Sequence, residues 1–190
     1  MKKILTIDCD IIMHPSINLY NDYDGTATEF YDEFNFLSLP PADLELYSKI
    51  VHFLKENKDK IEIIEDHDEI VEKTKIEGPF ELINIDHHHD VGYERVMVYN
   101  KIKSSDVNVG NWVKRLWDLN RITKYTWYRD NNSDLSTLST PAQKKYLTEI
   151  HFIDDLDFSA FGELEKIYIS ISNEWIPEYY KPLIDIIKDI

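Results

Sequence analysis

Apolar runs without polar alternation determine which fold class this chain can adopt. Segments such as 4–7 and 82–85 place isoleucine and leucine at neighbouring positions. Successive side chains of a strand point to opposite faces of its sheet, so a strand of this kind is covered on both faces. A parallel sheet between two layers of helices provides that environment. We therefore predict strands at five such runs, which are 3–9, 61–65, 80–86, 122–129 and 166–172.

Helical spacing appears between the predicted strands. Apolar residues recur at i, i+3, i+4 and i+7 over 47–54, behind a helix start signal at 40–43. Further helices are predicted at about 109–119 and after Pro177. Strands that alternate with helices predict an α/β fold, here a single three-layer domain with a mostly parallel sheet over residues 1–190.

The length and composition agree with one domain. The chain has 190 residues, of which 43% are hydrophobic, and contains no repeat or long linker. Cys9 is the single cysteine, so no disulfide can form within the chain. Asp8 and Asp10 interrupt the first apolar stretch before it could form a signal peptide, and no apolar run reaches the ~20 residues of a membrane span. We expect a cytoplasmic protein that does not contact membranes.

The charge balance restricts the ligands of this chain. There are 36 acidic and 21 basic residues, which give a formal net charge of −15. Such a chain repels the phosphate backbone of nucleic acids and attracts metal ions or substrates with ammonium or guanidinium groups. With five glycines in the chain, no glycine-rich phosphate-binding loop is present. We therefore expect a cationic ligand and no nucleic-acid partner.

Acids and histidines follow three of the predicted strands. Asp8 and Asp10 follow the first, 65–69 with His67 follows the second, and Asp86–Asp90 follows the third. Ligands of open α/β sheets bind beyond the carboxyl ends of the strands, so these side chains are candidates for one shared site. The alternatives are acids that cap strands and a histidine paired with its acidic neighbours on the surface. Another acidic stretch, Asp154, Asp155 and Asp157, competes with Asp8 and Asp10 for the same role.

The segment Asp86-His87-His88-His89-Asp90 is the strongest metal-binding pattern in the sequence. If the chain stays extended there, Asp86, His88 and Asp90 point to one face, while His87 and His89 point to the other. Two carboxylates and an imidazole suit manganese or magnesium better than zinc. The alternative interpretation is a histidine run on the surface.

This segment resembles the Asp-x-His-x-Asp signature of arginases and related ureohydrolases. Asp66-His67 resembles their Asp-His pair, and Thr6-Ile7-Asp8-Cys9-Asp10 resembles their Ser-x-Asp-x-Asp strand end. In those enzymes the latter motif lies late in the chain, whereas here it lies near residue 1. The order is similar to that of small, circularly permuted peptide arginases, in which a late Ser-x-Glu segment corresponds to Ser172-Asn173-Glu174.

The resemblance implies an arginase/deacetylase-like fold and two manganese ions, or another divalent metal. It places His67, Asp86, Asp90 and Asp8 around one ion and His88 with Asp10 at the other, with Asp86 and Asp8 as bridges. A metal-bound hydroxide would then hydrolyse the C–N bond of a guanidino group, converting arginine in a peptide or protein to ornithine plus urea. The resemblance pairs Glu174 with the guanidinium, and it requires a proton shuttle, for which His14, His87 and His89 are candidates.

Two other functions fit parts of the pattern. Ile85-Asp86-His87-His88 and Asp8-x-Asp10 also resemble motifs of manganese-dependent phosphoesterases of the DHH class. That family usually has a histidine before the early acids and a glycine after them, whereas this chain has Thr6 and Ile11 nearby. A non-catalytic relative that binds a metal or an arginine-bearing peptide is the third possibility.

Overall fold

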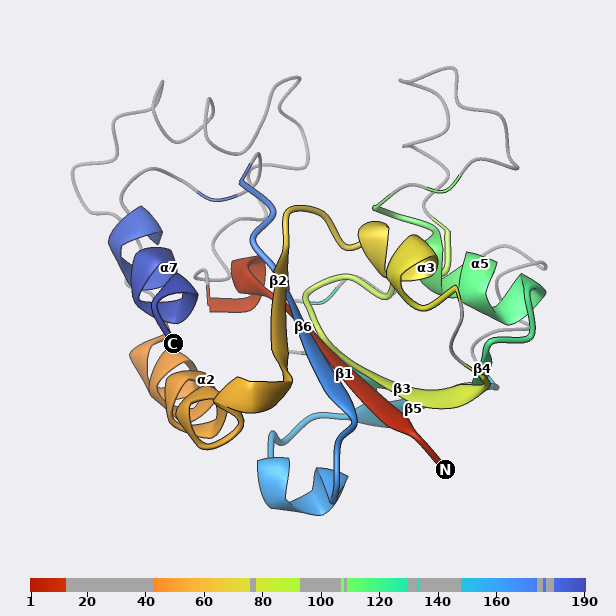
Figure 1. Ribbon diagram of the computed structural model, residues 1–190, viewed down its shortest axis with the longest axis horizontal. Helices are drawn as coiled ribbons and strands as arrows, with labels where there is room; N and C mark the ends of the chain where they lie inside the picture. Colours follow the sequence, from red (N-terminus) through yellow and green to blue (C-terminus); the bar gives the residue numbers. More distant parts are fainter. Residues whose placement is uncertain are drawn as a thin grey trace.

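One six-stranded, fully parallel sheet forms the centre of the computed structural model (Figure 1). The residues that the structure describes are 1–12, 43–75, 78–92, 107, 109–129, 133, 148–173, 176 and 180–190. The strands are β1 (Lys3–Asp8), β2 (Ile61–Ile64), β3 (Phe80–Ile85), β4 (Ile122–Tyr128), β5 (Ile150–Ile153) and β6 (Lys166–Ser170). Their order is β2-β6-β1-β3-β4-β5. The prediction of an α/β fold with a parallel sheet is confirmed.

The described α-helices are α2 (Leu44–Glu56), α3 (Glu69–Lys73), α5 (Trp112–Asp118) and α7 (Lys181–Lys188). Short 3-10 turns are η1 (Cys9–Ile12), η3 (Lys58–Lys60) and η5 (Phe158–Phe161). The α2 helix begins after Asp43, whose Oδ1 accepts the Leu46 N–H at 2.9 Å. None of the helices in the described part of the chain is long and apolar enough to cross a lipid bilayer.

Helices cover both faces of the sheet, so the molecule has two apolar cores. Leu5 and Ile7 of β1 pack in the core that includes α2 and α7, whereas Ile4 packs in the core with α3 and α5 (Figure 1). Alternate side chains of a single strand therefore stabilise opposite layers, as its unbroken apolar pattern predicts. A fully buried leucine or isoleucine contributes roughly 1.5–3 kcal/mol to such a core.

The sheet has a topological switch point between β1 and β3. The two strands are direct neighbours. The connection after β1 leads through α2 in one layer, whereas the connection after β3 leads through α5 in the opposite layer. Two connections that leave in opposite directions open a crevice at the carboxyl ends of the strands. Asp8 and Asp86 lie at this position.

Candidate metal centre

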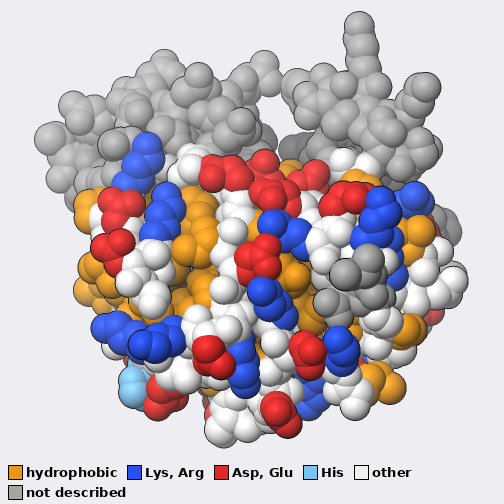
Figure 2. All heavy atoms as spheres, viewed as in Figure 1, with side chains coloured by type: hydrophobic (Ala, Val, Ile, Leu, Met, Phe, Trp, Pro, Cys, Tyr) orange, Lys and Arg blue, Asp and Glu red, His pale blue; other side chains and the backbone are white. Residues whose placement is uncertain are grey.

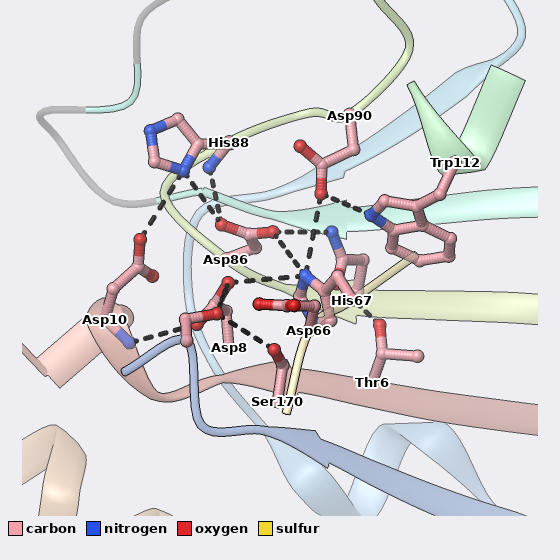
Figure 3. Close-up of polar contacts among 12 residues, drawn as sticks. Thr6, Asp8, Asp10, Asp66, His67, Asp86, His88, Asp90, Trp112 and Ser170 are labelled. Atoms are coloured by element: carbon pink, nitrogen blue, oxygen red, sulfur yellow. Dashed lines mark hydrogen bonds and ion pairs between the residues drawn. The ribbon is translucent and has the colours of Figure 1, made fainter. Parts of the chain in front are cut away.

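Six acids and histidines from three strand ends converge at the switch point (Figure 3). They are Asp8 at the end of β1, Asp10 in η1, His67 between β2 and α3, and Asp86, His88 and Asp90 after β3. They form two groups, which we call the His67 group and the His88 group. These six are the residues that the resemblance to ureohydrolases implies as metal ligands.

The His67 group is almost completely buried. Its centre is Nδ1 of His67, which lies 3.4 Å from Oδ2 of Asp8, 3.2 Å from Oδ2 of Asp86 and 3.6 Å from Oδ2 of Asp90. The His67 side chain is 2% exposed, and none of the three carboxylates exceeds 10%. Three carboxylates around one imidazole inside a protein are costly without a cation.

The His88 group lies closer to solvent. Nδ1 of His88 is 3.5 Å from Oδ2 of Asp10 and 3.4 Å from Oδ1 of Asp86. The His88 side chain is 50% exposed, whereas Asp10 is 5% exposed. This group therefore combines a buried carboxylate with an imidazole that solvent and ligands can reach.

Asp86 belongs to both groups. Its Oδ2 faces His67 and its Oδ1 faces His88, so one carboxylate joins the two (Figure 3). Asp8, the other predicted bridge, presents Oδ2 to His67, while its Oδ1 accepts the Asp10 N–H at 3.3 Å. The shared carboxylate of Asp86 is the feature that makes the two groups one site.

A turn, and not an extended strand, brings Asp86, His88 and Asp90 to the site. β3 ends at Ile85, and Oδ1 of Asp86 then accepts the His88 N–H at 2.8 Å. Asp90 adopts a left-handed backbone conformation with a φ of 52°. The segment is therefore not extended as the prediction assumed, although the side chains of Asp86, His88 and Asp90 still reach one site. Aspartate tolerates both features better than most residues, because its short side chain bonds to nearby backbone groups.

Further side chains hold the carboxylates in place. Nε1 of Trp112 donates to Oδ2 of Asp90 at 2.6 Å, and Oγ of Ser172 donates to Oδ2 of Asp8 at 3.1 Å. Nδ2 of Asn84 donates to Oδ2 of Asp86 at 3.2 Å. These roles could not be predicted from the sequence, because a tryptophan, a serine or an asparagine beside an apolar run gives no pattern specific to ligand support.

Burial and the closeness of the charged groups shift the pKa values of several residues in this site. Burial, strengthened by the nearby Asp86 carboxylate, raises the pKa of Asp90 from 3.8 to about 7. Burial and Asp10 raise the pKa of Asp8 well above its usual range. Burial also favours neutral Asp86, but hydrogen bonds from His67 and His88 outweigh it and hold the pKa of Asp86 well below its usual range. The pKa of His67 rises because its carboxylate neighbours, Asp8 foremost, outweigh its burial.

The donor set fits a divalent cation. It contains four carboxylates and two imidazoles, the oxygen-rich mixture that suits manganese. Within the described residues, no lysine or arginine pairs with these carboxylates, and Oδ1 of Asp10 is buried without a hydrogen-bond partner. A cation would neutralise the carboxylates and replace the protons that burial otherwise favours on Asp8 and Asp90.

The structure describes only some of the candidate catalytic residues. Glu174 and His14 lie outside the described residues. His89 is fully buried, its Nδ1 accepts the Val91 N–H at 3.1 Å, and its ring lies edge-on to Trp127. These contacts fit a structural role for His89 better than the predicted proton shuttle. His87, the remaining candidate, is half-buried.

Other acids of the sequence have separate roles. Asp154, Asp155 and Asp157 are exposed beyond the edge strand β5, and Asp157 caps η5 through the Ser159 N–H. The predicted preference for Asp8 and Asp10 agrees with this placement.

The acids around His67 bond elsewhere. Glu69 accepts the Glu65 N–H at 2.9 Å. Among the described residues, Nε2 of His67 has no hydrogen-bond partner, so the acids flanking His67 do not orient its ring through this nitrogen.

The chain matches no model of a known protein family, no curated protein and no solved structure. Its function is therefore inferred from the site itself.

Proposed function

We propose that this chain is a dinuclear metal hydrolase that converts arginine side chains in peptides or proteins to ornithine and urea, with an arginase-like arrangement of ligands. The observation that carries the proposal is Asp86, whose two oxygens face His67 and His88 separately. A single carboxylate shared in this way suits two ions held a short distance apart. The six ligands would hold two manganese ions, or two ions of another divalent metal.

Bound divalent ions would lower the pKa of a water molecule towards neutrality and so supply a nucleophile at physiological pH. The residues of the chain determine where that nucleophile can act. Protein atoms cover the three carboxylates of the His67 group almost completely, whereas the His88 side chain is half exposed. Substrate would therefore approach from the side of His88, with Asp10 and Asp86 directing the reacting atoms.

The charge of the site favours a cationic substrate. Four carboxylates balance two divalent ions, so the loaded site presents no excess positive charge to a phosphate. Acidic residues also gather where β2 ends and α3 begins, around segment 65–69 (Figure 2). A shallow hollow beside α3 is lined by Asp68, Glu69 and Glu72 together with Lys73. This field attracts guanidinium groups and repels phosphodiesters, which weighs against the phosphoesterase alternative.

The test is urea release from an arginine-containing peptide by the purified protein with manganese. We expect Asp86→Ala to abolish urea release, because both groups lose a ligand. The matched control is Asp154→Ala, which removes an exposed acid that follows β5 and should leave the rate unchanged. Urea release that persists in Asp86→Ala would refute the site. Hydrolysis of a phosphodiester without urea would instead support the DHH-type phosphoesterase, and manganese binding without turnover would support the non-catalytic relative.

A further inference from the structure

A polar layer crosses the sheet directly beneath the metal centre. Thr6 in β1 and Asn84 in β3 are 0% exposed, although the strands around them are apolar. The two residues are register partners in the parallel β1–β3 pair. Tyr125 of β4 is also 0% exposed and completes the layer. Buried polar groups are costly unless hydrogen bonds satisfy them, so the contacts of this layer determine its effect.

The hydrogen bonds of the layer fix the orientation of the Asn84 amide. Oγ1 of Thr6 lies 2.5 Å from Oδ1 of Asn84 and 3.3 Å from the Ile83 carbonyl, so its single hydrogen is donated to the much closer Asn84 oxygen. The Tyr125 hydroxyl donates its hydrogen to the His89 carbonyl at 3.0 Å, so it can only accept from Asn84, whose Nδ2 lies 3.2 Å away. The second N–H of the amide then points to Oδ2 of Asp86 at 3.2 Å. A flipped amide would place its carbonyl oxygen against the carboxylate.

These hydrogen bonds restrain the carboxylate of Asp86, which joins the two groups. Oδ2 of Asp86 accepts from Asn84, while Oδ1 accepts the His88 N–H at 2.8 Å. The main chain of Asp86 is also held, because its carbonyl accepts from Nε1 of Trp127 at 2.8 Å. Both oxygens and the backbone of Asp86 are therefore restrained, and the carboxylate plane keeps one oxygen on each group.

We infer that Asn84, oriented by Thr6 and Tyr125, is a positioning residue that holds Asp86 as the bridge between two metal ions. This inference rests on the dinuclear centre of the proposed function, but it concerns metal binding and does not depend on the reaction. Outer hydrogen bonds of this kind orient ligands, and their removal typically weakens metal binding roughly 10- to 100-fold.

The test compares near-isosteric variants of two buried threonines in the full-length protein. Thr6→Val removes the hydroxyl that orients Asn84, and Thr6→Ser retains it. Thr74→Val is the matched control, because Thr74 is also 0% exposed but its hydroxyl bonds to Ile70 O within α3 at 2.7 Å. The readouts are manganese stoichiometry and affinity by calorimetry, and the electron paramagnetic resonance signal of a coupled ion pair.

We expect two coupled ions in the wild type, Thr6→Ser and Thr74→Val. In Thr6→Val, the affinity of the second ion should fall roughly 10- to 100-fold and the coupled signal should weaken. Tyr125→Phe should also lower the affinity of the second ion. This variant takes the place of Thr6→Val in the test if Thr6→Val does not fold. Two coupled ions with wild-type affinity in these variants would overturn the inference. So would an equal loss in Thr74→Val, or a wild-type protein that binds fewer than two ions.

The urea assay separates this inference from the proposed function. A wild type that binds two coupled ions but releases no urea contradicts the proposed reaction, while the effect of Thr6→Val still decides the role of Asn84. Conversely, urea release with unchanged metal binding in Thr6→Val and Tyr125→Phe overturns the positioning role alone.

Discussion

The indole of Trp112 and the carboxylate of Asp90 are joined by a 2.6 Å hydrogen bond in the buried interior. The main chain strengthens this link, because the Asp90 carbonyl accepts the Val113 N–H at 3.2 Å. The beginning of α5 is thus bonded to the loop that follows β3. Asp90 in turn presents the same Oδ2 to His67.

Trp112→Phe should therefore weaken manganese binding. The variant keeps an aromatic ring in the core but leaves Oδ2 of Asp90 without its donor, and we expect affinity for the buried ion to fall roughly 10- to 100-fold in calorimetric titration. Phe80→Leu is the control for packing, because Phe80 is fully buried in the same apolar core as Trp112 and has no polar side-chain atom. An equal loss of affinity in both variants would mean that the effect comes from packing.

Manganese should stabilise the folded protein. An ion that binds the folded chain alone adds about 2.7 kcal/mol when its concentration is one hundred times the dissociation constant. For a chain of this size, that corresponds to a rise of about 5–10 °C in the melting temperature. Differential scanning calorimetry with manganese and after chelation measures the difference. Asp86→Ala should show no rise, and a wild type that melts at the same temperature under both conditions contradicts a metal centre.

Asp90→Asn should change how stability depends on pH. Folding raises the pKa of Asp90 from 3.8 to about 7, so its stabilising contribution is complete below 3.8 and is lost as pH rises through 7. Asparagine resembles the protonated acid and tolerates the left-handed backbone. In chelator, the variant should exceed the wild type in urea-denaturation stability at pH 8, with a smaller difference at pH 5. With manganese at pH 8, the wild type should be the more stable protein. The same order in chelator and in manganese would contradict the assignment.

Ser172 combines a left-handed backbone, with a φ of 49°, and a hydrogen bond to Asp8. Ser172→Ala and Ser172→Gly both remove the hydroxyl, but only glycine relieves the backbone strain. We expect Ser172→Gly to be more stable than Ser172→Ala by about 1–2 kcal/mol in urea denaturation. Both variants should bind manganese more weakly than the wild type. Equal stability of the two variants would show that the backbone is not strained at this position.

The ligands could be predicted from the sequence because they follow apolar runs. Parallel strands bring their carboxyl ends to one edge, so Asp8, His67 and Asp86 meet although they are far apart in the chain. The path after Asp86 could not be predicted in the same way. The His88 N–H bonds to the Asp86 side chain instead of to a neighbouring strand, and this hydrogen bond turns the chain. The alternation of polar and apolar residues in the sequence does not show which of the two hydrogen bonds forms.

The residues that hold the ligands in place were harder to predict than the ligands themselves. Thr6 and Asn84 occur within apolar runs, where the pattern is the same whether a polar side chain has a partner or not. Two short elements were also missed. The α3 helix has five residues, too few to show helical spacing, and β5 is a four-residue edge strand in which only Ile150 is buried.

The position of β1 between β6 and β3 affects how the protein folds during its synthesis. Ile4 pairs with Leu82 on one side and with Lys166 on the other, so β1 is completed only when β6 has been synthesised. Pairing over such long sequence separations slows folding. During translation, β1 would have an unpaired edge that exposes it to aggregation or to chaperones until residues near 170 leave the ribosome.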